Sequence, residues 1–456
     1  METPVALRFE VTSPANIQGF DAAAAVRPVP GPHGLPEPLR SRSMTAFTPP
    51  HTNDDPALEA ARLLTRIGVF LLFVVALIAP VIAGQTIYIL LPVGAALLLM
   101  GAAVAPDRRK KTAPLRGLLT TPPFLAALFL AAWAAVSLNW TPFHAGPAER
   151  YWKDAGTLGL VAIACGFLPA RTRICDLNLL PIGVAAASLG MIAAAAYGYF
   201  ARRSFTLEEI VDGDALARSG VGLLLIMWPA AGALAMRGKW RFAAALTLVS
   251  GVAALVSGAQ NVTPPLVAGF AIFGLCFGRP REARLWLAPL AAATILLSPL
   301  VALGVRFFFQ GHAPDLFKSL DVWGHIFAGG GARSLLGHGF GSAIYGLFGG
   351  YLDPKAPRSL AFQIWFDLGL VGAAAFAAAA YKAFSIVGLT RTSLAPFLLA
   401  GLSAGLAVCL LGPAGEQLWA FTLAGLDAVA FVMVMRGQAT KKRPHLPRWA
   451  IVDDKD

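Results

Sequence analysis

The sequence is poor in charged residues and in cysteine. Only 14% of its 456 residues are Asp, Glu, Lys or Arg, whereas about 25% is usual for a soluble globular chain. The four cysteines are widely separated, and no pair has the C-x-x-C spacing of a metal site. These deficits, together with long apolar runs, exclude a soluble enzyme, a disulfide-rich secreted scaffold and a disordered chain.

The common catalytic and metal-binding motifs are also missing. The chain contains no HExxH, no EF-hand loop and no P-loop. Each of those patterns places ligands or a nucleophile at a spacing that its chemistry requires. We therefore expect neither a metal site nor a cofactor.

Apolar residues are what the chain has in excess. They make up 57% of the sequence, with a mean hydropathy of +0.64, and they form runs long enough to cross a bilayer as helices. The fold predicted is an all-α polytopic membrane protein with about twelve transmembrane helices and one long periplasmic loop containing short helices. The candidate spans are 66–84, 86–105, 122–139, 155–170, 179–200, 218–236, 242–259, 264–278, 285–307, 361–381, 394–412 and 417–435.

The distribution of Lys and Arg predicts the orientation. If the N-terminus is cytoplasmic, 27 of the 37 Lys and Arg residues lie on the cytoplasmic side, as the positive-inside rule requires. We expect a disordered cytoplasmic tail at 1–61, a membrane domain at 62–436 and a cytoplasmic tail at 437–456. The formal net charge of +12 then records orientation, and it is no sign of a nucleic-acid partner.

The segment between about residues 308 and 360 is the longest predicted loop. A loop of about 50 residues is uncommon unless it folds or has a function. It contains a helical-looking stretch, Ala313–Phe327, followed by a turn rich in glycine, Gly337–Gly341. A turn of this kind allows backbone N–H groups to approach a ligand closely.

Several arginines lie on the predicted outer side, where the positive-inside rule disfavours them. Arg150, Arg218 and Arg333 each adjoin a span or a glycine turn. A guanidinium group keeps its charge and binds phosphate oxygens in a bidentate way, so these residues suit an anionic ligand such as a lipid diphosphate. The alternative is that they are solvated or paired with acidic residues of the same loops.

Two motifs in this part of the chain resemble the O-antigen ligase and polymerase family. The first is the turn Leu336–Gly341, read LGHGFG, and the second is Phe362–Gly372, read FQIWFDLGLVG, at the start of a span. Trp323 before the turn, Arg218 at the start of a span and the stretch Glu416–Trp419 also fit. The likeness covers roughly residues 62–436.

The resemblance implies an integral-membrane glycosyltransferase of the bacterial inner membrane that needs no metal. Members of the family move a glycan from an undecaprenyl-diphosphate carrier to an acceptor sugar on the periplasmic face. Carried over by position, Arg150 and Arg218 bind the diphosphate with help from Lys153, and Gly337 and Gly339 shape the floor of the site. Arg333 is a further binding candidate. The partners implied are the lipid-linked glycan donor, a glycolipid or glycan acceptor, and membrane lipids.

One position departs from the family pattern. The family has a histidine just before the tenth span, and this chain has Arg358 there, which cannot act as a base at neutral pH. His338 in the glycine turn is the candidate substitute, because histidine titrates in the required range; the alternative is a turn histidine that binds backbone. Asp367, an acid within a span, is expected to support the site by orienting an arginine.

Three other functions stay open. A chain-extending polymerase with the same fold is not separable from a ligase by composition. A transporter of an anionic lipid-linked glycan would use the outer arginines for binding alone, although we find no inverted repeat. The missing histidine also leaves room for a non-catalytic family member.

Overall fold

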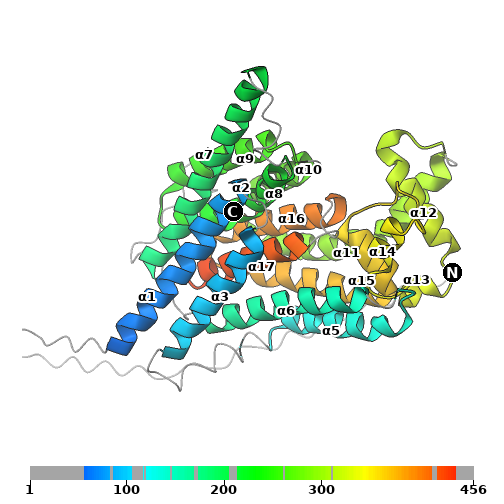
Figure 1. The fold of residues 1–456 in the computed structure, drawn as a ribbon, viewed down its shortest axis with the longest axis horizontal. Coiled ribbons are helices and arrows are strands. Elements are labelled where there is room, and N and C mark those ends of the chain that lie inside the picture. The colour runs from blue at the N-terminus through cyan, green and yellow to red at the C-terminus, as the bar shows by residue number, and fades with distance from the viewer. Residues whose placement is uncertain are drawn as a thin grey trace, which may run out of the picture. The chain divides into compact units, whose positions relative to one another are not determined.

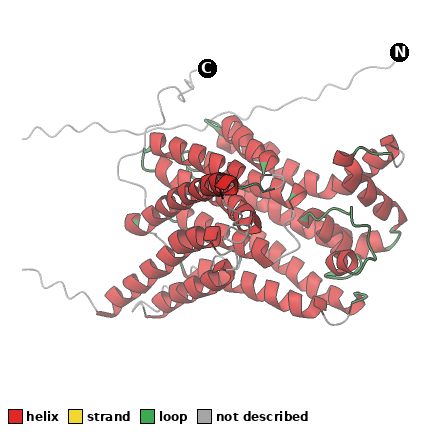
Figure 2. Cartoon of the chain, turned by 45° about the horizontal axis from the view of Figure 1, so that its top comes forward, coloured by secondary structure: helices red, strands yellow, loops and turns green. Residues whose placement is uncertain are grey.

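A computed structural model describes residues 56–82, 86–104, 117, 120–143, 146–168, 173–204, 213–259, 262–309, 312–412 and 418–437. All the regular secondary structure in these residues is helical, and no β-strand occurs among them (Figure 2). Most of the two predicted tails lies outside the described residues. Helix α1 begins at Pro56, inside the range that we assigned to the N-terminal tail.

The helices follow the apolar runs of the sequence: the predicted span 66–84 overlaps α1, η1 and α2, and each of the other eleven candidate spans overlaps a single α-helix. Their bounds are α1 (Pro56–Phe70), the π-helical turn η1 (Leu71–Val75), α2 (Ala76–Ile82), α3 (Thr86–Val104), α5 (Pro122–Ser137), the 3-10 turn η3 (Leu138–Trp140), α6 (Gly146–Phe167), α7 (Ile174–Ser204), α8 (Gly213–Ala235), α9 (Trp240–Val256), α10 (Thr263–Cys276), α11 (Pro280–Phe309), the 3-10 turn η4 (Asp315–Phe317), α12 (Lys318–Gly329), α13 (Arg333–Leu336), α14 (Ser342–Phe348), α15 (Leu360–Val387), α16 (Ala395–Leu411) and α17 (Leu418–Met435).

Within the described residues, seven helical segments are long and apolar enough to cross a membrane. They are Pro56–Val81, Thr86–Val104, Pro122–Trp140, Ile174–Tyr199, Leu216–Ala235, Pro280–Phe309 and Leu360–Val387. Four further apolar helices, α9, α10, α16 and most of α17, are shorter. Large apolar side chains such as Ile89, Phe242 and Leu248 are exposed on these helices. The chain is therefore a helical membrane protein, and its apolar outer surface contacts lipid.

Helix α6 differs from the other predicted spans. It begins at Gly146 rather than near residue 155, and its first turns carry two acidic and two basic side chains. These charges explain why α6 is not among the seven apolar segments, because charged groups are costly inside the hydrocarbon layer.

Two hydrophobic clusters organise the interior. The larger one joins α1–α3 with α6–α11 and α15–α17 around large buried side chains such as Trp228 and Phe73. The smaller one joins α11, α12, α14 and α15 around Trp323, Phe362 and Trp365. The candidate site residues predicted from the sequence divide between the regions of these two clusters.

The predicted long loop folds into short helices against two long ones. Helix α12 packs on α11, and α13 and α14 pack on α15. Figure 1 shows α12, α13 and α14 together at one end of α15. Helix α5 packs along α15 as well, so the segment before α15 and the helix α5 meet the same part of α15.

Candidate functional site

Helix α15 is broken at Gly369. The backbone of Gly369 has φ 66° and ψ −161°, a conformation that is essentially restricted to glycine. A Cβ atom at this position would collide with the carbonyl oxygen of Leu335. A break of this kind releases the carbonyl groups of the preceding turn from helical pairing, so they can accept hydrogen bonds from elsewhere.

Three consecutive carbonyl groups before the break accept hydrogen bonds from outside α15. The carbonyl oxygen of Phe366 accepts from the backbone N–H of His338 at 2.9 Å, and that of Asp367 accepts from the N–H of Gly339 at 2.9 Å. The carbonyl oxygen of Leu368 accepts from the indole N–H of Trp133 at 3.1 Å. The glycine turn is therefore bound to α15 at the break, through the carbonyl groups that the break leaves free of helical pairing.

The glycine turn, Gly337–Gly341, needs its glycines for this close approach. Gly337, Gly339 and Gly341 have φ of 81°, 98° and 82°, backbone angles that residues other than glycine rarely adopt. A Cβ atom on Gly337 would collide with the backbone of Asp367, and one on Gly339 would lie 2.6 Å from the Cα of Thr141. The glycines admit the protein's own backbone rather than a ligand.

The N–H groups of the turn are already bound within the protein. In addition to those of His338 and Gly339, the N–H of Phe340 donates to the hydroxyl of Ser137 at 3.0 Å. The N–H of Gly337 donates to the carbonyl of Arg333 at 2.7 Å. We expected these amides to face a ligand, and the structure shows that they fasten the turn instead.

Asp367 also holds the turn. Its Oδ2 accepts from the N–H of Gly341 at 2.9 Å, and its Oδ1 accepts from the N–H of Ala343 at 2.7 Å. The carboxylate thus satisfies two amides at the start of α14, where helices leave N–H groups without partners. Its support role is exerted on the backbone of the turn, whereas we expected it to act on an arginine.

His338 is held from two directions. Its Nδ1 lies 3.0 Å from the carbonyl oxygen of Phe366, and its ring stacks on the ring of Phe366 with centroids 4.1 Å apart and planes 6° apart. Burial lowers the pKa of His338 below its usual value, the bond to Phe366 opposes this, and the charge of Arg333 adds to the lowering. The imidazole is consequently neutral and able to accept a proton at neutral pH.

His338 and Arg333 line the same pocket, which we call the His338 pocket. It is open to solvent, with about 290 Å³ of space that no atom fills, part of it open solvent, and five of its ten lining residues are Phe or Trp. Its lining residues are Trp323, Ile326, Phe327, Gly330, Arg333, Ser334, His338, Phe362, Trp365 and Phe366. An apolar, aromatic wall with a few polar groups is typical of small-molecule sites.

Arg358 lines a second pocket, the Arg358 pocket, which is open to solvent and has about 240 Å³ of space that no atom fills, part of it open solvent. Phe362 belongs to the walls of both pockets. The Arg358 pocket also contains Gln363, which is buried. Ser359, next to Arg358, accepts a hydrogen bond from the N–H of Phe362 and so caps the start of α15. Phe362 is thus the wall residue that the Arg358 pocket shares with the His338 pocket.

Arg150 and Lys153 form two separate ion pairs on α6, one half-buried and one exposed. Arg150 pairs with the buried Asp154 at 3.5 Å, and burial raises the pKa of Asp154 to about 6 against the opposing effect of Arg150. Lys153 pairs with Glu149 at 2.6 Å on the exposed face, where the pair lowers the pKa of Glu149 and raises that of Lys153.

The start of α6 also touches the glycine turn. The ring of Tyr151 meets that of Phe340 edge-on, with centroids 5.7 Å apart, and Pro147 lies against Gly341. Arg150, one residue before Tyr151, is therefore placed beside the turn, and its charge acts on Asp367. Lys153 is held by its exposed partner instead.

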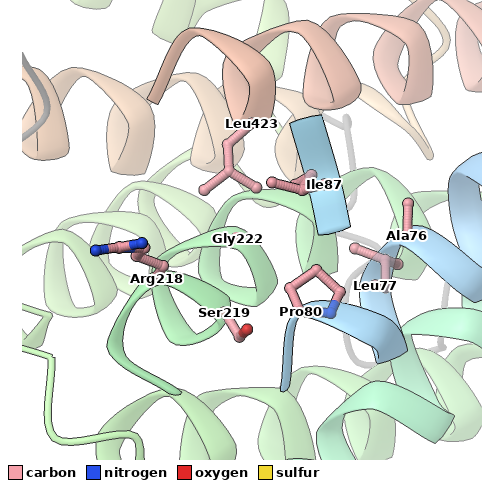
Figure 3. A pocket seen from close by; sticks show the side chains of 8 residues that line it. All are labelled: Ala76, Leu77, Pro80, Ile87, Arg218, Ser219, Gly222 and Leu423. Carbon is pink, nitrogen blue, oxygen red and sulfur yellow. The ribbon is translucent and has the colours of Figure 1, made fainter. Parts of the chain in front are cut away.

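Arg218 lies in a separate pocket, the Arg218 pocket, whose other lining residues are Ala76, Leu77, Pro80, Ile87, Ser219, Gly222 and Leu423. None of these lining residues belongs to the other two pockets. Figure 3 shows the guanidinium group of Arg218 extending away from Pro80 and Leu77, which lie across the pocket. The structure thus places His338 with Arg333, Arg358 next to them and Arg150 beside the turn, but it places Arg218 elsewhere.

Phe366 and Gly369 lie within the motif Phe362–Gly372, but sequence reasoning assigned neither a role of its own, and it did not point to Trp133 or Ser137 at all. Trp133 and Ser137 lie four residues apart on α5, and both bind the region of the break. Their spacing is a helical one, which is the only signal the sequence offers. No group of three or more His, Cys, Asp and Glu side chains that could hold a metal ion occurs in the described part of the chain.

Comparisons with known proteins add no relative. No protein-family model matches the sequence, and searches of curated proteins and of solved structures return no significant match.

Proposed function

We propose that the protein is a membrane glycosyltransferase similar to O-antigen ligases, which moves a glycan from a polyprenyl-diphosphate carrier to an acceptor hydroxyl. The observation that carries the proposal is the His338 pocket. It combines a histidine of lowered pKa with an arginine in an aromatic-walled space beside membrane-spanning helices. A base and a fixed cation are the two groups that this transfer requires.

The proposed reaction is a single displacement. The acceptor hydroxyl oxygen forms a bond to the anomeric carbon of the donor sugar, while the bond from that carbon to the diphosphate oxygen breaks. His338 takes the hydroxyl proton, and the diphosphate leaves with the bonding electron pair. Arg333, which lines the same pocket, stabilises the charge that develops on the leaving oxygen.

The surrounding residues divide the remaining tasks. The rings of Trp323, Phe327 and Trp365 give the pocket flat apolar surfaces, which suit the carbon-bound face of a sugar ring. Arg358 and Gln363, on the other side of Phe362, offer a cation and an amide to the second substrate. Arg150 adds positive charge beside the turn.

The proposal also specifies the compartment. Lipid-linked donors and surface glycans meet on the periplasmic face of the bacterial inner membrane, and the Lys and Arg distribution predicts that the segment 308–360 lies there with both termini in the cytoplasm. Membrane lipids, the lipid-linked donor and a glycan or glycolipid acceptor are the partners of this proposal.

Transport of a lipid-linked glycan is a second candidate, because transporters often bind substrates at helices broken within the membrane. The break in α15 is such a feature. However, the three carbonyl oxygens before the break already accept hydrogen bonds from His338, Gly339 and Trp133. In transporters such carbonyl groups coordinate the coupling ion, so the transferase is the better account of this site.

The test is the surface-glycan profile of a deletion strain of the host. Loss of attached polymer identifies a ligase, whereas attached polymer of collapsed chain length identifies a polymerase. Complementation with His338→Ala or Arg333→Ala should leave the defect in place although the protein inserts normally. His325→Ala, at an exposed histidine of α12 outside the pocket, is the matched control and should restore the glycan. An intact profile in the deletion strain contradicts the proposal.

A further inference from the structure

The bond from His338 to Phe366 depends on the break in α15. In an uninterrupted α-helix, the carbonyl oxygen of Phe366 would pair with the N–H of Leu370. Gly369, with φ 66° and ψ −161°, lies between these two groups and turns the backbone away. The Phe366 carbonyl is therefore presented to the glycine turn.

That carbonyl receives two donors from one residue. The backbone N–H of His338 lies 2.9 Å from it, and the ring Nδ1 of His338 lies 3.0 Å from it. A carbonyl oxygen has two lone pairs and can serve both, but it can only accept. The hydrogen must consequently be on Nδ1. A neutral imidazole carries one N–H, so Nε2 keeps its lone pair.

The orientation of the ring is fixed as well. The imidazole stacks on Phe366 with planes 6° apart, and Phe366 stacks in turn on Phe362 with centroids 5.6 Å apart. Among the residues that the structure describes, none forms a hydrogen bond with Nε2 of His338. The ring is pinned at Nδ1 and on one face, and Nε2 is left for chemistry.

The charged groups around His338 do not favour the other tautomer. Arg333 on α13 shares its pocket and carries no acceptor. Asp367 on α15 directs both carboxylate oxygens to the amides of Gly341 and Ala343. Helix α12 contributes the apolar rings of Trp323 and Phe327 to the pocket. The Phe366 carbonyl is thus the group that selects the tautomer.

We propose that Gly369 is a positioning residue, because the break that it makes in α15 uses the Phe366 carbonyl to hold His338 as the Nδ1–H tautomer with Nε2 as the proton acceptor. The catalytic consequence rests on the proposed transferase function. The tautomer itself does not, and it can be measured whether or not the protein transfers a glycan.

Nitrogen NMR of the full-length protein tests the tautomer directly. Protein labelled with ¹⁵N-histidine in detergent micelles gives separate shifts for protonated and unprotonated ring nitrogens, and the signals that vanish in His338→Asn belong to His338. We expect the Nδ1–H form to exceed the Nε2–H form by about tenfold, the ratio that one hydrogen bond supports. An excess of the Nε2–H form, or an equal mixture, overturns the proposal.

Two variants separate the carbonyl from the ring stack. Phe366→Leu removes the aromatic ring but keeps the carbonyl, so the tautomer ratio should stay as in the unchanged protein. Gly369→Ala introduces a Cβ that collides with Leu335. The Phe366 carbonyl should then no longer hold His338, and the ratio of the Nδ1–H form to the Nε2–H form should fall toward one. If Gly369→Ala does not fold, Phe366→Leu still decides, because loss of the Nδ1–H preference there contradicts the assignment to the carbonyl.

Two replacements of His338 distinguish the assignment of the tautomer from the proposed transferase function. The side-chain amide of Asn can donate to the Phe366 carbonyl as Nδ1 does, whereas that of Gln extends toward the position of Nε2. Both lack a base, so both should reduce transfer by about 100-fold or more, while Asn keeps the thermal stability better than Gln. Full transfer by His338→Asn contradicts the proposal that His338 is the base, but it does not affect the assignment of the tautomer.

Discussion

The His338 pocket lies among short helices, a turn and a broken helix, whereas the Arg218 pocket lies between long helices of the larger hydrophobic cluster. Around His338, hydrogen bonds join side chains of α5 and α15 to the backbone of the glycine turn, of the start of α14 and of the break in α15. Around Arg218 the lining is mostly apolar, and the buried hydroxyl of Ser219 has no hydrogen-bond partner in the described part of the chain. Catalytic geometry needs side chains fixed by such a supporting network, and the region around His338 supplies one.

The largest difference between the two regions should be in stability. Asp367→Ala removes the acceptor of two buried amides, Gly341 N–H and Ala343 N–H, each of which costs about 1–3 kcal/mol when left unsatisfied. We expect a loss of about 3 kcal/mol in the free energy of unfolding, together with loss of transfer. Thermal unfolding in detergent measures it.

Ser219→Ala is the matched control for that variant. It deletes a buried hydroxyl that has no partner in the structure, so stability should stay the same or rise slightly. A large loss with Ser219→Ala and a small one with Asp367→Ala would reverse the comparison.

The next largest effect concerns the arginines. Arg333→Ala should lower the transfer rate by about 100-fold, as expected for removal of a group that stabilises developing charge. Arg218→Ala should lower it by less than about tenfold, because Arg218 lines a separate pocket from the proposed base. Rates in a purified system with lipid-linked donor provide the measurement. If Arg218→Ala is the more severe variant, the reaction belongs to the Arg218 pocket, as position in the sequence alone predicts.

A smaller effect is expected in the titration of His338. The charge of Arg333 helps to lower the pKa of His338. Removing this charge in Arg333→Ala favours the protonated imidazole, so the titration midpoint should move to higher pH by less than about one unit. Transfer by the unchanged protein should rise with pH through its own midpoint, since the neutral ring is the base. Ring-nitrogen shifts followed against pH give the midpoints, and a downward shift contradicts the placement of Arg333 beside His338.

The smallest effect should come from Lys153. Its ion pair with Glu149 is fully exposed, and exposed pairs contribute little to stability. We expect Lys153→Ala to leave both the melting temperature and the transfer rate unchanged within error. A marked loss of transfer would return Lys153 to the substrate-binding residues.

Part of this site could be predicted from the sequence because its signals are local. The glycine turn stands out by spacing, His338 lies within it, and Asp367 is an acid inside an apolar run. The partners of these residues could not be predicted, since they come from far along the chain. Asp367 binds amides 24 and 26 residues away, and the Phe340 amide binds Ser137, 203 residues away.

The break at Gly369 was hidden for a different reason. Glycine is frequent in membrane helices, and nothing in the letters around Gly369 distinguishes a left-handed backbone from a helical one. The spans themselves were easier, because an apolar run predicts a helix by composition alone. Their number remains a prediction beyond the seven segments that satisfy length and composition.

The break also has a mechanical consequence. Membrane helices tilt when the surrounding bilayer is thicker or thinner than their apolar length, and a continuous rod would carry that tilt to its far end. In α15 the carbonyl groups of the three residues before Gly369 bind α5 and the turn, and the backbone leaves the helical conformation at Gly369 itself. If the break absorbs such a tilt, the proposed transfer should proceed at similar rates in vesicles of short-chain and long-chain lipids.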